Sequence, residues 1–211
     1  MRLLSFLLFT LFLSISANAQ YSKLSLNVNG AYTFQDRVDF DAFYTKVKDG
    51  FQYGGSLEYF TSRRQSVELT YNRMDTYFPL YRKSGTQIPT QNNKGAVNYV
   101  LLGGNSYFPQ SYDSKLLPFF GGGVGVGWFE GNQNSSAKFA FNIKAGAKIK
   151  TNSAISFKVN AYLQSIVSTF GTDYWYGWYG YVYAVPDYAT LWQFGLGGAI
   201  CFDFKPHTAA K

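Results

Sequence analysis

The sequence predicts an all-β protein, an eight-stranded antiparallel up-and-down β-barrel whose strands cross a membrane. Only 15% of the 211 residues are charged, against about 25% in an average soluble domain. Tyr, Phe and Gly number 18, 20 and 21, so the apolar surplus comes from rings and glycine, and an all-helical fold is disfavoured. Apolar residues also alternate with polar or small ones along most of the chain, which is the period of a β-strand.

The N-terminal segment is expected to be a cleaved secretory signal. Arg2 precedes an apolar run over residues 3–15, and Ala17, Asn18 and Ala19 then form a small-residue cleavage site. A membrane-anchoring helix needs about 20 apolar residues, and this run is shorter. The prediction is therefore a signal peptide at 1–19, a barrel domain at 20–204 and a short tail at 205–211.

Alternation marks six strands clearly. In residues 23–34, Leu26 and Val28 fall on one face of a strand, and Asn27 and Asn29 fall on the other. The same pattern covers residues 51–60, 66–75, 137–149, 155–164 and 190–204.

Two less regular segments, 96–108 and 116–129, bring the count to eight, and ten strands remain an alternative. In the second segment, every other residue from Gly121 to Gly127 is glycine, which suits the inner wall of a narrow lumen.

The connections and the chemistry of the two faces favour a membrane barrel over a soluble one. The large apolar residues on one face of each strand must face lipid, because the residues on the opposite face include Asn, Gln, Ser, Lys and Glu. Closure is required because an open sheet edge finds no hydrogen-bond partners in lipid. Alternating connection lengths predict short periplasmic turns and long extracellular loops. The long connections are 35–50, 76–95 and 165–189, the short ones are 61–65, 109–115 and 150–154, and 130–136 is intermediate.

Two glycine- and aromatic-rich segments resemble a known family. Residues 117–127 (LPFFGGGVGVG) and 195–204 (GLGGAICFDF) are similar to strands of the small eight-stranded outer-membrane barrels of the OmpA, OmpX and OmpW type. The resemblance covers residues 21–204. It implies a place in the Gram-negative cell outer membrane, contact with its lipids, and recognition of the last strand by the barrel-assembly machinery. Seven residues follow Phe204, where many members of the family end.

No residues for catalysis, metal binding or cofactor binding emerge. The chain has one His, His207, in the tail and one Cys, Cys201, which leaves no Cys/His nucleophilic pair and no second histidine for a metal. A tail histidine without a nearby acid is also a poor base for a serine nucleophile. We therefore expect no enzyme activity, no cofactor and no metal.

The formal net charge of +7 does not indicate nucleic-acid binding, because the basic residues are scattered and form no stripe. At the rim of an outer-membrane barrel, basic residues can instead contact anionic lipopolysaccharide, and plain solvated charge is an equal alternative. The residues concerned are Arg73, Arg82, Lys83 and Lys94, around the second long loop.

Alternation along the strands places five charged side chains on the face that lines the lumen. Glu58 and Glu68 lie on the second and third strands, and Lys144, Lys148 and Lys158 lie on the sixth and seventh. Charges held away from water must be paired. We therefore predict an acidic wall facing a basic wall and blocking the lumen.

The last long loop carries a dense aromatic cluster and no Lys or Arg between residues 165 and 189. It could extend the two flanking strands as a hairpin whose rings pack together, or it could contact a glycan, a lipid, or a host or partner surface. The aromatic residues singled out are Tyr174, Trp175, Tyr176, Trp178, Tyr179 and Tyr181.

Together these features predict a monomeric outer-membrane barrel with a side-chain-filled lumen and a structural or surface-interaction role, because an eight-stranded barrel is about filled by its own side chains. The alternative is a narrow channel or transporter of small, possibly hydrophobic, solutes.

Overall fold

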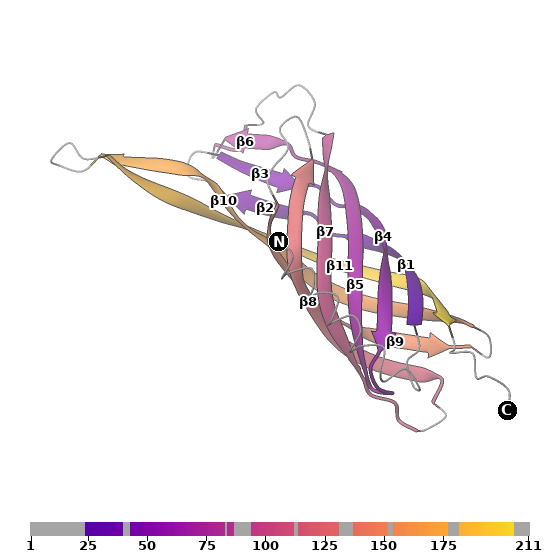
Figure 1. Cartoon of the computed structure of the whole chain (residues 1–211). Helices are drawn as coiled ribbons and strands as arrows, with labels where there is room; N and C mark the ends of the chain where they lie inside the picture. The colour runs from indigo at the N-terminus through magenta and orange to yellow at the C-terminus, as the bar shows by residue number, and fades with distance from the viewer. Residues whose placement is uncertain are drawn as a thin grey trace, which may run out of the picture.

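The computed structural model describes residues 24–39, 43–82, 84–86, 94–111, 114–130, 137–151, 154–176 and 182–204. Eight of the described strands form one closed antiparallel barrel in the order β1-β11-β10-β9-β8-β7-β5-β4 (Figure 1), which confirms the predicted fold class. None of the described residues forms a helix that is long and apolar enough to span a membrane. The barrel strands are β1 (Leu24–Thr33), β4 (Gly50–Phe60), β5 (Gln65–Tyr77), β7 (Lys94–Tyr107), β8 (Leu116–Glu130), β9 (Lys138–Lys150), β10 (Ile155–Tyr176) and β11 (Val182–Phe204).

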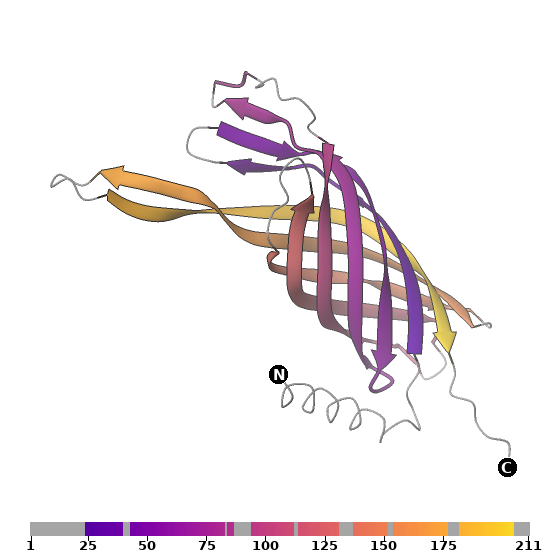
Figure 2. The ribbon, with the colours of Figure 1, turned by 45° about the horizontal axis from the view of Figure 1, so that its top comes forward.

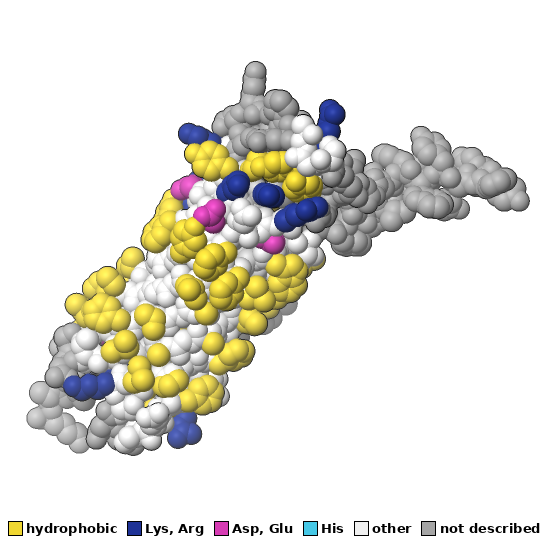
Figure 3. Space-filling view, turned by 180° about the vertical axis from the view of Figure 1, so that it is seen from behind, with side chains coloured by type: hydrophobic (Ala, Val, Ile, Leu, Met, Phe, Trp, Pro, Cys, Tyr) yellow, Lys and Arg dark blue, Asp and Glu magenta, His cyan; other side chains and the backbone are white. Residues whose placement is uncertain are grey.

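The two faces of the barrel wall differ as the alternation predicts. On β1, Leu26 is 41% exposed on the outside, whereas its neighbour Asn27 is fully buried inside. The outer surface is a broad apolar band, which continues around the side seen in Figure 3. This inverted arrangement, apolar outside and polar inside, is stable only where lipid surrounds the wall.

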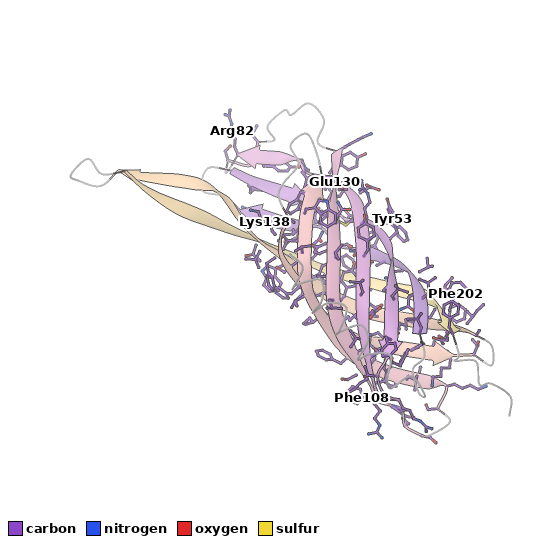
Figure 4. All side chains as sticks on the ribbon, viewed as in Figure 1. Tyr53, Arg82, Phe108, Glu130, Lys138 and Phe202 are labelled. Carbon is purple, nitrogen blue, oxygen red and sulfur yellow. The ribbon has the colours of Figure 1, made fainter. Side chains whose placement is uncertain are left out.

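The two ends of the barrel are built differently. At one end, here named the turn end, residues 61–64, 108–115 and 151–154 connect the strands. The first of these turns is closed by the backbone bond from Ser62 N–H to Gln65 O (3.2 Å). The opposite end is named the loop end; Figure 4 places Arg82 and Glu130 toward it and Phe108 toward the turn end.

A second, small sheet lies at the loop end, where the sequence predicted only loops. It consists of β2 (Asp36–Asp39), β3 (Phe43–Val47) and β6 (Leu80–Arg82), in the order β2-β3-β6. Its strands are three to five residues long and come from two separate connections. Such pairing depends on contacts between distant segments, so local alternation does not reveal it.

The connection at 165–189 is mostly β-strand, which confirms the predicted possibility that it extends the two flanking strands as a hairpin. β10 pairs with β9 only as far as Val167, opposite Phe139, but it pairs with β11 out to Tyr176, opposite Val182. Residues 168–176 and 182–189, here named the ribbon, therefore form a two-stranded extension that projects away from the barrel (Figures 1 and 2). At 3.3 Å per residue it reaches roughly 30 Å beyond the last β9 pair.

Candidate functional site: the lumen of the barrel

The lumen is closed at the turn end by an apolar and aromatic layer. Tyr107, Leu117 and Phe119 are buried there, and the half-buried Phe60 packs against them. The Tyr107 ring lies 5.5 Å from the Phe60 ring and 5.6 Å from the Phe119 ring. These side chains come from β4, β7 and β8, so the layer reaches across the barrel.

Glu58 is the most enclosed charged group of the lumen, with no exposed surface. Its carboxylate accepts hydrogen bonds from Lys158 Nζ (2.7 Å), Ser66 Oγ (2.6 Å) and the hydroxyl of Tyr107 (2.6 Å). Asn105 Nδ2 donates a further bond of 2.8 Å. A buried carboxylate is tolerated only when it is paired and hydrogen-bonded in this way.

Glu68 forms the second centre of the same network. Lys144 Nζ donates to one carboxylate oxygen at 2.5 Å, and Ser56 Oγ donates to the other at 2.6 Å. Lys158 Nζ lies 3.8 Å from Glu68 and so stands between the two glutamates. We name Glu58, Glu68, Lys144 and Lys158 the charged layer.

Lys148 does not join the charged layer, although strand parity placed it opposite the glutamates. Its ammonium group donates to Asp203 at 2.8 Å and lies 4.8 Å from the centre of the Phe60 ring. Ser156 Oγ also donates to Asp203, at 2.7 Å. Lys148 lies beside Phe60 at the turn end, so the inward carboxylate of β11 is its partner instead.

The structure thus brings together four of the five predicted lumen charges. Alternation along residues 190–204 puts Asp203 on the same face as Gln193, so counting carboxylates against ammonium groups on that face would have found it. Asn105 and Tyr107 were also missed, because their segment alternates less regularly.

A small polar cavity of about 60 Å³ lies between the charged layer and the loop end. Lys144, Lys158 and Tyr162 contribute to its wall. The other polar lining residues include Asn29, Gln52, Thr70, Asn72, Asn142, Asn160 and Gln164. Its size and polarity suit a few water molecules.

Beyond the cavity the lumen is crossed by neutral hydrogen-bonded side chains. The Tyr162 hydroxyl lies 2.7 Å from Thr33 Oγ1 and donates to Gln52 Oε1 at 2.7 Å. The Tyr99 hydroxyl donates to Gln193 Oε1 at 2.7 Å. We name these residues, together with Gln164, the neutral layer.

An apolar layer closes the loop end. Val47, in β3 of the small sheet, is 2% exposed and packs among barrel residues there. Ile166 fills the notch left by Gly127, where an added Cβ would lie 2.7 Å from Ile166 Cδ1. The ring of Tyr99, whose hydroxyl belongs to the neutral layer, also packs here. The other members of this layer are Met74, Val97, Leu101, Ala140 and Leu191, with Phe78 and Phe129 packed against them.

Arg73, predicted at the rim, belongs to an ion network on the outer wall. Its guanidinium lies 2.6 Å from the Glu130 carboxylate and 3.0 Å from that of Asp75. Tyr53 donates to Asp75 at 2.8 Å. Arg82 lies in β6, Lys94 begins β7, and Lys83 falls outside the described residues.

The predicted aromatic cluster falls partly within the ribbon. Tyr174, Trp175 and Tyr176 belong to β10, and Trp175 is paired in register with Tyr183 of β11. Trp178, Tyr179 and Tyr181 fall outside the described residues, as do the predicted signal segment and the tail with His207.

The described residues contain no group of three or more His, Cys, Asp or Glu that could hold a metal ion. Cys201 is buried and unpaired. The lumen instead offers balanced ion pairs, hydrogen-bonded amides and two apolar closures. Together with the apolar outer wall, these features define the class of protein: a membrane-spanning β-barrel with a filled interior.

The chain matches the model of the outer membrane protein beta-barrel domain over residues 5–198, and it belongs to this family. The predicted resemblance to small outer-membrane barrels is therefore confirmed. No curated protein sequence matches the chain.

Solved structures share the fold at low sequence identity. Neisserial surface protein A (NspA) is 11% identical with a TM-score of 0.57, covering 86% of this chain and 97% of that one. The outer membrane protein OprG from Pseudomonas aeruginosa is 12% identical with a TM-score of 0.60, covering 86% and 95%. The outer membrane protein AlkL, solved in DMPC lipid bilayers, is 14% identical with a TM-score of 0.52, covering 92% and 96%. The chain is thus similar to other outer-membrane barrels.

Proposed function

We propose that this outer-membrane barrel is a non-conducting scaffold that presents the ribbon to a glycan, a lipid, or a host or partner surface. The double closure of the lumen is the observation that carries the proposal. Val47 and Ile166 fill the loop end, Tyr107 and Phe119 fill the turn end, and the charged layer lies between them. A lumen filled in this way has no continuous aqueous path.

The ribbon supports the second half of the proposal. A two-stranded hairpin is at best marginally stable alone in water, yet this one continues for several residue pairs beyond the barrel. Its segment, residues 165–189, has no Lys or Arg and a dense run of Tyr and Trp. Such residues offer rigid contact area with a polar tip, as recognition surfaces do.

The proposal includes an orientation and a route to the membrane. The turn end faces the periplasm and the ribbon faces the cell exterior, as in other outer-membrane barrels. Residues 1–19 direct export and are removed, the barrel-assembly machinery inserts residues 20–204, and the product is a monomer. Rim cations such as Arg82 and Lys94 contact lipopolysaccharide. No catalytic role, cofactor or metal is part of the proposal.

Deletion of residues 174–181 tests the contact role. The deletion is expected to leave heat-modifiable migration in detergent gels intact, while abolishing binding of cells that display the protein to glycan arrays and host-cell surfaces. A W175A/W178A variant should reproduce the loss, and Trp192→Ala, in the barrel wall, should not. Loss of folding, or binding that survives both ribbon variants, would overturn the proposal.

A narrow channel is the second candidate, and the central cavity is the observation that favours it. If the apolar closures moved aside, this polar space would lie on the path of a small solute. Planar-bilayer recordings separate the two candidates, since a steady conductance that survives deletion of the ribbon would favour transport.

A further inference from the structure

The two ends of the barrel carry different charge patterns. At the loop end, acids accompany the bases, as in the Arg73 network with Asp75 and Glu130. At the turn end, the described exposed charges are all basic: Arg63, Arg64, Lys115 and Lys150. The described acid at this end, Asp203, is bound within the lumen by Lys148 and Ser156. On the face seen in Figure 3, the turn end shows Lys or Arg without Asp or Glu among the described residues.

The backbone fixes these cations in place. Lys150 N–H donates to Lys115 O at 2.8 Å, so an exposed lysine at the end of β9 lies opposite one that directly precedes β8. Tyr107 N–H donates to Arg64 O at 2.7 Å, which ties the β4–β5 turn to the end of β7.

The cations border the lipid-facing band directly. Lys115 precedes Leu116, which is 48% exposed, and Lys150 follows Ile149, which is 42% exposed. Phe108, in the same turn region as Lys115, is 60% exposed. Long basic side chains next to exposed apolar surface place their charge at the level of the lipid headgroups.

We propose that the turn end binds the phosphate headgroups of anionic diacylphospholipids through Arg64, Lys115 and Lys150, with Arg63 beside them. The sequence of the three turns includes one acid, Asp113, against these four bases, so the net charge stays positive. The phosphodiester supplies the negative charge, and its acyl chains lie against Phe108, Leu116 and Ile149. This site is separate from the ribbon and does not depend on the contact role proposed for it.

Native mass spectrometry of the detergent-solubilised barrel tests this site, with dioleoyl phosphatidylglycerol as the anionic probe and dioleoyl phosphatidylcholine as its zwitterionic counterpart. Each cation near an anionic headgroup is worth about fivefold in affinity. The wild type is expected to bind phosphatidylglycerol at least about fivefold more tightly than phosphatidylcholine, and added salt should reduce this preference because it screens the charges.

The variant R64Q/K115Q/K150Q should lose the preference, and the matched loop-end variant K46Q/K48Q/K138Q, which removes the same charge, should keep it. If the triple variant does not fold, as judged by heat-modifiable migration in detergent gels, the double variant K115Q/K150Q replaces it. Absence of a preference in the wild type, a preference that survives in the turn-end variants, or loss only in the loop-end variant would each overturn the proposal. Co-sedimentation with cell-wall sacculi gives a further check. If the turn-end variants lose co-sedimentation while their lipid preference is unchanged, the ligand is a cell-wall anion and the proposal is overturned.

Discussion

The charged layer and the neutral layer fill the same lumen by different chemistry. In the charged layer, Glu58 and Glu68 are surrounded by two lysines and by hydroxyl and amide donors. In the neutral layer, the hydroxyls of Tyr162 and Tyr99 bond to glutamine side chains. Both layers are hydrogen-bonded, but only the first holds full charges inside the barrel.

The difference predicts unequal tolerance to mutation. Removing one partner of a buried ion pair leaves an uncompensated charge, whereas removing one neutral donor leaves a single unmet hydrogen bond. The charged layer should therefore be more sensitive to mutation than the neutral layer.

The largest effect is expected for Glu58→Gln, which leaves Lys158 with only its longer 3.8 Å approach to Glu68. The free energy of unfolding should fall by about 3–5 kcal/mol, measured by urea titration in lipid vesicles. The double variant E58Q/K158M should recover much of this loss, because it removes both charges. An equal loss in the double variant would mean that shape and not charge governs this layer.

A charge placed on the outer wall should cost nearly as much. Leu26→Arg puts a guanidinium into the apolar band and should destabilise the barrel by about 2–4 kcal/mol if the residue lies near the bilayer midplane. Leu26→Phe is the matched control and should be tolerated. Equal tolerance of both variants would contradict the assignment of this face to lipid.

A smaller effect is expected in the neutral layer. Tyr162→Phe removes the hydroxyl shared with Thr33 and Gln52 and should cost about 1 kcal/mol in the same titration. A cost as large as that of Glu58→Gln would erase the distinction between the two layers.

The smallest effect is expected on the outer wall at the loop end. Arg73 is paired with Glu130 and Asp75, but all three side chains are partly exposed. Arg73→Gln should therefore cost at most about 1 kcal/mol, and the cost should shrink as salt is added. A loss comparable to that of the buried pair would show that this network is shielded from solvent.

The sequence allowed the barrel to be predicted because alternation is local. All eight barrel strands were expected within a few residues of their observed ends, apart from the long extensions of β10 and β11. The alternation also placed Glu58 and Lys158 on the inward face. It could not show which of these side chains meet, because that depends on the relative height of strands far apart in sequence.

The parts that were missed depend on contacts between distant segments. Val47 lies in a segment predicted as a loop, and it joins the loop-end closure through the pairing of β3 with β2 and β6, in which Val47 is opposite Asp36. Tyr99 and Gln193 lie 94 positions apart in the chain, so no spacing rule joins them. The ribbon was expected only as one of two possibilities, because its aromatic and glycine-rich segment fits a loop as well as a strand.

The closure of the lumen is the central claim, and planar-bilayer recording of the wild-type barrel tests it most directly. The barrel is expected to show no steady conductance, because apolar layers fill both ends and the charged layer lies between them. Glu68→Gln removes the carboxylate that binds Lys144, so any conductance should appear first in that variant. A steady conductance of the wild type that persists after deletion of residues 168–189 would contradict the account.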